Sequence, residues 1–238
     1  MDATAVNRIL QAIVRPLLRD QGFRVSTARS AWRHREGLID VVNFQSFNRY
    51  NADVLGCTPF SFAVNLGVYL TDVPSDYPLP VRAGQPAPEE YRCHIRRRLK
   101  PLHPILPKAA DVWVINETGL NVEDTVQAAA FELLGTGTKW FEAFRDTATV
   151  LAVLQEALPS SDDTTRSPGL PDSPAWNTAI GYLARALEQT SVAARHLRRA
   201  LDQLRDMDAQ HSAMRLKMPK MVPRHLEEAV AMMDGPSA

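Results

Sequence analysis

One stretch of the chain, residues 60–70, alternates apolar with small or polar side chains without a gap, and it constrains the fold more than any other feature. Its sequence is FSFAVNLGVYL, with apolar side chains at Phe60, Phe62, Val64, Leu66, Val68 and Leu70. A two-residue period places these side chains on one face of an extended strand and the small or polar ones on the other. The chain is therefore expected to build a β-sheet with one face against a core.

Further strands are predicted on both sides of this one. Residues 30–45, SAWRHREGLIDVVNFQ, predict two strands joined by a tight turn at Glu36 and Gly37, because glycine accepts the positive φ that such a turn needs. Two more strands are predicted at 91–99 and 111–116, which gives a mainly antiparallel, five-stranded sheet. Residues 72–88 hold five prolines, so a surface loop is expected there.

Helical periodicity surrounds the strands. Residues 4–19 place apolar side chains at the spacing of an amphipathic helix, and the chain from 121 to 157 is helical in pattern. A GTGT stretch at 135–138 is expected to stop the first of these later helices, with Thr138 as the N-cap of the next. Helices at about 175–188 and 190–209 predict a helical hairpin, followed by a short helix near 224–233. The fold class is α+β, with helices flanking the sheet.

A change of composition divides the chain. Residues 159–174, PSSDDTTRSPGLPDSP, are rich in Ser, Pro and Asp and offer little to bury, which is typical of a flexible linker. We therefore expect a sheet domain at 1–158, the linker at 159–174 and a helical C-terminal extension at 175–238.

Charge and cysteine content exclude several classes of protein. The formal net charge is zero and the pI is about 7.0, so no global field draws the chain to nucleic acid or to an anionic membrane. Residues 1–117 carry 15 Lys and Arg against 11 Asp and Glu, whereas the remainder carries 12 against 16. The two cysteines, the absence of a leader pattern and the absence of an apolar run of about 20 residues predict a cytoplasmic protein that does not enter membranes.

The positive charge of the first half is concentrated at residues 93–102, CHIRRRLKPL. If 91–99 is extended, Cys93 points to the core with Ile95 and Leu99, whereas His94 points the other way and cannot pair with the thiol. The outward row is expected to share a surface with amide and phenol side chains of neighbouring strands. The candidate binding residues are Arg92, His94, Arg96, Arg98, Asn65, Tyr69, Asn43 and Gln45.

Such a surface suits an acidic protein or a phosphate-bearing partner, because the planar guanidinium fork matches carboxylate and phosphate oxygens. A nucleic-acid backbone is a further possibility. The alternative is that the same face is solvated or docks on the acidic helices of its own chain, since exposed charges often contribute nothing measurable.

Signals for catalysis or metal binding are weak. Asp40 would be a partly buried carboxylate on a strand, and with Asn65, His94 and Arg96 it provides the parts of a metal-dependent enzyme acting on nucleic acid or another phosphate-bearing substrate. However, the acidic and lysine pair expected on the next strand is missing. The six histidines lack the spacing of zinc ligands, and the GTGT stretch lacks the lysine of a phosphate loop. No cofactor and no metal are expected.

The C-terminal extension offers a second candidate surface. Residues 190–209 mix both charges around a leucine stripe, which fits either a packed helix with exposed ion pairs or a seam for self-association or another protein through 175–209. Residues 214–233 are rich in methionine, which suits an adaptable protein-binding surface or a loosely packed end.

Several short motifs occur together in an order that resembles the bacterial family known as domain of unknown function 4304. The resemblance covers about residues 4–155 and rests on Gly22 and Phe23, Trp32 and Arg33, and residues 41–45, 64–69, 93–96 and 113. It implies a mainly antiparallel sheet flanked by helices, and the family has no established activity to carry over to this chain. Many small α+β bacterial domains act as immunity proteins or accessories of defence systems, which suggests by analogy a non-enzymatic binding protein of this type.

Overall fold

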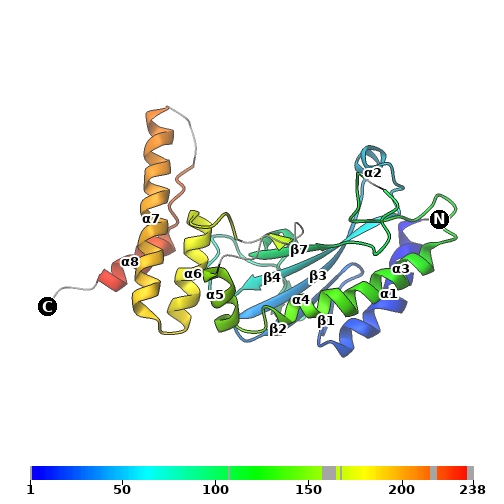
Figure 1. The fold of residues 1–238 in the computed structure, drawn as a ribbon, viewed down its shortest axis with the longest axis horizontal. Helices are drawn as coiled ribbons and strands as arrows, with labels where there is room; N and C mark the ends of the chain where they lie inside the picture. Colours follow the sequence, from blue (N-terminus) through cyan, green and yellow to red (C-terminus); the bar gives the residue numbers. More distant parts are fainter. Residues whose placement is uncertain (1, 107, 157–164, 167, 215–218, 235–238) are drawn as a thin grey trace.

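The computed structural model describes residues 2–106, 108–156, 165–166, 168–214 and 219–234. A twisted sheet forms the centre, long helices run along one of its faces, and a group of helices is stacked at one end (Figure 1). None of the described helices is both long and apolar enough to cross a membrane.

The sheet is antiparallel throughout its described pairings. Four strands are neighbours in chain order, β2 (Ser30–Arg35), β3 (Leu38–Ser46), β4 (Phe62–Leu70) and β7 (Ile95–Leu99). The short β1 (Val25–Ser26) pairs with β2, β9 (Thr165–Arg166) pairs with β7, and β8 (Val112–Trp113) pairs with β4. The predicted fold class, an antiparallel sheet with flanking helices and C-terminal helices, is confirmed.

The register decides which side chains share a face. Asn43 of β3 lies opposite Asn65 of β4, and Asn65 lies opposite Arg98 of β7. Directly opposed residues in an antiparallel sheet point to the same face. The predicted alternation is confirmed over 62–70, whereas Phe60 and Ser61 lie before the strand, and the predicted turn between the first two long strands holds Gly37 at φ 71°.

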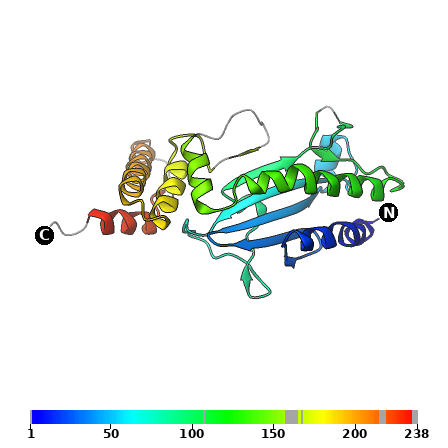
Figure 2. The same cartoon turned by 60° about the horizontal axis from the view of Figure 1, so that its bottom comes forward.

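The first face of the sheet is covered by helices. These are α1 (Ala3–Asp20), α3 (Val122–Glu132), the π-helical segment η2 (Leu133–Gly137) and α4 (Thr138–Glu142). Figure 2 shows the last three as one uninterrupted helix along the sheet. The predicted stop at 135–138 is therefore wrong. A Cβ on Gly137 would lie 2.9 Å from Cδ1 of Leu133, one turn earlier in the same helix, and 3.5 Å from Leu99 Cδ1 of the sheet, so this glycine leaves room for the Leu133 side chain.

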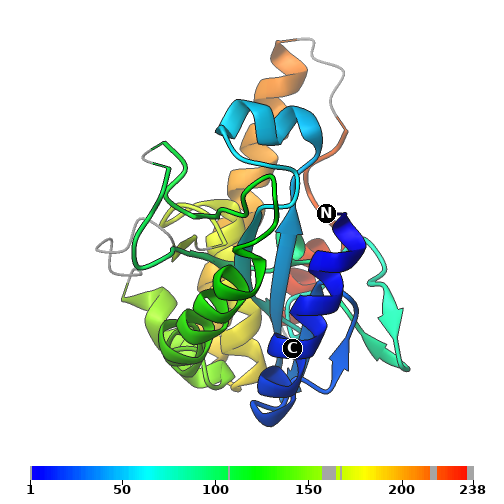
Figure 3. The same ribbon diagram turned by 90° about the vertical axis from the view of Figure 1, so that its right-hand side faces the viewer.

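Within the described residues, the second face is covered at its two ends. At one end the loop with β5 (Val81–Arg82), β6 (Gln85–Pro86) and η1 (Glu90–Arg92) buries Trp32, Tyr69 and Cys93. At the other end α2 (Arg49–Leu55) and the chain near Ala109 bury Ala63 and Val112. Figures 1 and 3 show α2 on the opposite side of the sheet from α1 and α3.

After α4, the described part of the chain forms four more helices. α5 (Thr147–Gln155) leads to α6 (Pro174–Ala186) and α7 (Thr190–Ala213), which form the predicted hairpin, and α8 (Arg224–Asp234) packs against α7. Their buried side chains belong to the same apolar cluster as the sheet core. Of the predicted linker 159–174, residues 159–164 and 167 lie outside the described residues, and Thr165–Arg166 form β9.

Candidate functional site

Side chains of three neighbouring strands form a hydrogen-bonded row in the middle of the second face. The Asn65 amide donates to Gln45 Oε1 at 3.0 Å and to Asn43 Oδ1 at 3.4 Å. Arg98 donates through Nε to Asn65 Oδ1 at 2.9 Å and through Nη2 to Gln45 Oε1 at 3.0 Å. Its Nη1 lies 2.8 Å from Asp111 Oδ2. The structure thus brings four of the predicted residues together and neutralises the charge of Arg98 within the chain.

Two further arginines lie nearer the end covered by the loop. Arg96 makes a two-point pair with Glu90, with Nε at 2.8 Å from Oε1 and Nη2 at 3.4 Å from Oε2. Arg92 donates to the carbonyl oxygens of Pro78 at 3.0 Å and Tyr77 at 2.9 Å. Arg92 belongs to η1, so the predicted strand 91–99 is wrong over its first four residues and the arginines do not form one continuous row.

His94 and Tyr69 form a ring-to-ring contact. Their ring centroids are 4.8 Å apart, and His94 Nδ1 accepts a hydrogen bond from the backbone N–H of Leu70 at 3.0 Å. Burial lowers the pKa of His94 to about 4, so the imidazole is neutral near pH 7. His94 therefore adds a polar side chain to the site and no positive charge.

Cys93 does not point into the core with Ile95 and Leu99, contrary to the prediction. It packs in the small cluster of the second face, close enough to Gly67 that a Cβ on the glycine would lie 2.5 Å from Sγ. The reason is the turn of η1, which breaks the strand alternation before Ile95. Burial raises the pKa of the Cys93 thiol, which keeps it protonated and disfavours a nucleophilic role.

A cleft of about 840 Å³ separates this part of the sheet from the C-terminal helices. One wall is polar and includes Tyr69, Tyr77, Arg92, His94 and Arg96. Four of these five residues belong to the set predicted from the sequence. The cleft, and not the central row with Arg98, is thus the place where the predicted basic residues border a cavity.

The opposite wall is mostly apolar and comes from the C-terminal part of the chain. Its lining includes Leu204, Met207, Met221, Pro174 and Pro223. His225 spans the cleft, since Nε2 lies 3.7 Å from Asp76 Oδ1 while Nδ1 lies 2.8 Å from the Tyr182 hydroxyl. Sequence reasoning did not assign these residues to the site. The methionine-rich segment at 214–233 suggested a protein-binding surface. It did not indicate that this surface faces the polar wall of the cleft.

The four residues considered for an enzyme are not brought together. Asp40 is fully buried on the helix-covered face, where it pairs with Arg33 at 2.7 Å and with Arg35. Asn65 and Arg96 lie on the second face of the sheet. Among the described residues, no group of three or more His, Cys, Asp or Glu side chains is placed to hold a metal ion.

Comparison with known families places most of the chain in one family. Residues 14–143 match the family described as Domain of unknown function (DUF4304), which is more than half of the chain. The chain belongs to this family, as the motif order predicted. The matched region contains strands β1 to β8 and the polar wall of the cleft, whereas β9, α6, α7 and α8 lie outside it. No curated protein and no solved structure shows a significant match.

Proposed function

We propose that the protein is a non-enzymatic binding protein that holds a segment of an acidic or phosphate-bearing protein partner in the cleft. The observation that carries this proposal is the pairing of two unlike walls around one cavity of about 840 Å³. Arg92 and Arg96 offer guanidinium donors to carboxylate or phosphate oxygens. Met207 and Met221 offer flexible apolar surface to side chains of the same segment.

The arginines are oriented before a partner arrives. Glu90 occupies two of the five N–H donors of Arg96, and two loop carbonyls hold Arg92 in place. A guanidinium fixed in this way loses little side-chain entropy when it meets an oxyanion. The pairing with Glu90 also lowers the local positive charge, so we expect binding of moderate strength that weakens with salt.

A protein segment fits this cleft better than a nucleic-acid backbone. Asp76 lines the same cavity, and Glu90 is paired to one of its two arginines. Phosphate backbones are bound mainly by uncompensated Lys and Arg. A polyanionic backbone would make no favourable contact with the apolar wall, whereas the aliphatic or aromatic side chains of a peptide would pack against it.

Two wider expectations accompany this proposal. The helical hairpin at 175–209 is proposed as a second contact surface, through which a partner or a second copy of the chain associates. We also propose that the protein is cytoplasmic and is of the immunity or defence-accessory type.

The proposal is tested by single substitutions on each wall. Partners captured by the full chain are identified by mass spectrometry and then titrated, together with a panel of acidic and phosphorylated peptides, by fluorescence anisotropy. Arg96→Ala and Met207→Glu are each expected to weaken binding about tenfold or more, the usual effect at a central contact.

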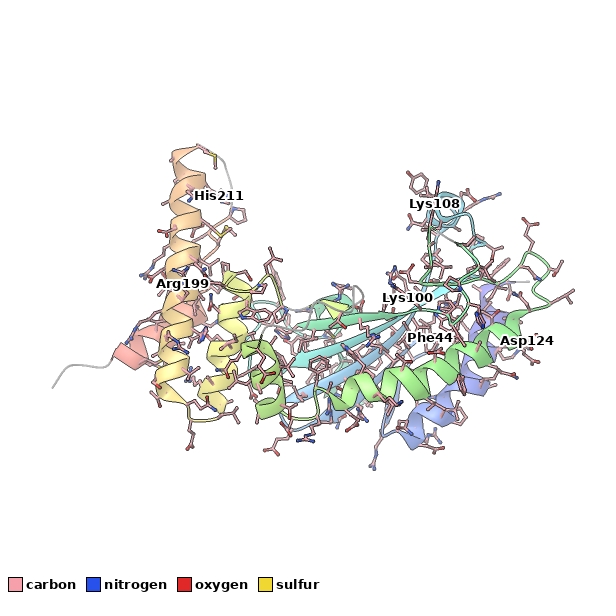
Figure 4. The ribbon with its side chains drawn as sticks, viewed as in Figure 1. Phe44, Lys100, Lys108, Asp124, Arg199 and His211 are labelled. Atoms are coloured by element: carbon pink, nitrogen blue, oxygen red, sulfur yellow. The ribbon has the colours of Figure 1, made fainter. Side chains whose placement is uncertain are left out.

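Matched controls separate the cleft from general surface effects. Lys100→Ala removes a cation just after β7, and Met214→Glu changes a methionine at the end of α7, both exposed. Figure 4 shows Lys100 well separated from α7. Neither control residue lines the cleft, so both variants should bind normally. An affinity that Arg96→Ala and Met207→Glu leave unchanged would remove the cleft from the function.

The alternative of a metal-dependent enzyme gains no support from the side-chain positions. Asp40 is separated from Asn65 and Arg96 by the sheet itself, and its carboxylate is already paired with Arg33 and Arg35. We therefore do not propose this activity.

A further inference from the structure

We propose that two copies of the chain associate through an apolar pocket of about 320 Å³ between α3 and the loop after β7. Its lining includes Leu102 and Ile105 of the loop, Val112 and Val114 at or beside β8, and Ala128 and Phe131 of α3. None of its lining residues borders the cleft of the proposed function or belongs to the α6–α7 hairpin. This inference therefore stands apart from both.

Three large apolar side chains around the pocket are exposed to solvent. Leu102, Ile105 and Phe131 are 73%, 65% and 74% exposed. Single exposed apolar side chains are common on protein surfaces, but several around one apolar hollow mark a site of interaction. We infer that another molecule covers this surface.

The same surface offers a projecting side chain and a hollow that receives one. Phe131 is largely exposed, and the pocket that it borders is wide enough for a phenyl ring, since a cavity of about 150 Å³ already holds benzene. In a two-fold dimer one surface patch meets the identical patch of the other copy. The phenyl ring of each copy therefore enters the pocket of the other.

The charges beside the pocket have opposite signs on its two sides. Lys100 and Lys108 are exposed on the loop side, whereas Asp124 and Glu132 lie on α3, one turn before and one turn after the lining residue Ala128 (Figure 4). Within the described residues none of these four charged side chains forms an ion pair.

This distribution of charge indicates which molecule covers the pocket. A second copy turned by 180° places its acidic helix opposite the basic loop of the first, and its basic loop opposite the acidic helix. Both contacts then join opposite charges at once. A partner of a single charge, such as a nucleic acid, would be repelled by one of the two sides.

Sedimentation velocity of the full chain over a concentration series tests the proposal. We expect a reversible monomer–dimer equilibrium, and the series extends to about 0.5 mM because interfaces below the standard size of about 800 Å² per partner are weak. Phe131→Glu places a carboxylate at the centre of the contact and should weaken the dimer about tenfold or more. Val81→Glu makes the same kind of change at an exposed position of β5 that does not line the pocket, and it should have no effect.

Charge reversal separates a two-fold dimer from other apolar association. One variant carries Lys100→Glu with Lys108→Glu, and the other carries Asp124→Lys with Glu132→Lys. Each should remain monomeric alone, because like charges then face each other. An equimolar mixture should form a mixed dimer, and Phe131→Ala in both chains should abolish it.

Three results would overturn the proposal. These are a chain that stays monomeric up to about 0.5 mM, far above the range of a specific interface, a dimer that Phe131→Glu leaves intact, and a mixture of the two charge variants that stays monomeric. Circular dichroism checks that each variant is folded. A dimer that dissociates with Arg199→Glu and not with Phe131→Glu would assign the contact to the α6–α7 hairpin instead.

Discussion

At the scale of single residues, Asp40 illustrates the difference between a functional and a structural carboxylate. It is fully buried between Arg33 and Arg35, whose guanidinium groups also reach Glu142 and the backbone carbonyl of Phe144. Burial raises the pKa of Asp40 although both arginines oppose this effect. The cluster therefore joins the β2–β3 hairpin to the end of α4, and its role is in folding.

Removal of the Asp40 carboxylate should be strongly destabilising. Asp40→Ala removes the carboxylate that two largely buried guanidinium groups share and leaves Arg33 with Glu142 at 4.0 Å, so we expect a loss of about 3–5 kcal/mol. Asp40→Asn keeps one acceptor oxygen and should cost less. The free energy of unfolding, measured with urea, checks this, with Glu36→Ala at the exposed turn as the control. A loss below about 1 kcal/mol for Asp40→Ala would show that the cluster is not a structural centre.

His94 should make the protein sensitive to mild acid. Its pKa is about 4 in the folded protein, against an ordinary value of 6.5 for a histidine, so between these values the unfolded chain binds more protons. Stability from this residue is complete above pH 6.5 and falls by at most about 3 kcal/mol as the pH drops toward 4.

His94→Asn tests this pH dependence. The asparagine oxygen replaces Nδ1 as acceptor for the Leu70 N–H and does not titrate, so stability between pH 6.5 and 4 should fall less than in the wild type. His103→Asn, at an exposed loop position, serves as the control. Identical pH profiles for His94→Asn and the wild type would refute the assignment.

At the scale of elements, the sequence predicts those features that depend on the local spacing of apolar side chains and on the residues that a turn requires. The strand at 62–70 and the turn at Gly37 follow from alternation and from the positive φ of glycine. The continuation through η2 does not, because glycines in a GTGT stretch are typical of a helix end, whereas Gly137 here lies against Leu133 of the same helix and near Leu66 and Leu99 of the sheet. Four site residues, Asn43, Gln45, Asn65 and Arg98, were predictable because the period fixes their face. The acidic partner of Arg98, Asp111, lies in a loop and was not predictable from the period.

The α6–α7 hairpin contains a similar close contact that yields a prediction. A Cβ on Gly181 would lie 2.5 Å from Leu197 Cγ and 3.1 Å from its backbone nitrogen. Gly181→Ala should therefore separate the helices and destabilise by about 1–3 kcal/mol, although alanine favours a helix. Gly135→Ala in η2 meets nothing within 4 Å and should stabilise slightly. Thermal unfolding distinguishes the two, and stabilisation by Gly181→Ala would mean that the hairpin packs more loosely than described.

At the scale of the whole molecule, one apolar cluster joins the family region to the helices that follow it. It includes Val6 of α1, Leu66 of β4, Leu154 of α5, Leu183 of α6 and Leu226 of α8. Composition predicts a linker at 159–174 between a sheet domain and a helical extension, and this division stays a prediction. A sequence pattern indicates what a segment is unable to bury and not what its flanks contact. The cleft depends on this junction, since its two walls come from the two parts.

A shared core predicts that the two parts unfold together. Leu183 is fully buried in α6, so Leu183→Ala should cost about 2–5 kcal/mol. In native-state hydrogen exchange, the slowest amides of β4 should lose as much protection as those of α6, because both exchange through global unfolding. Arg185→Ala, exposed on the same helix, should leave both sets unchanged. If Leu183→Ala weakens α6 and leaves β4 protected, the C-terminal helices form a separate unit, and the cleft is then a boundary whose width varies with their motion.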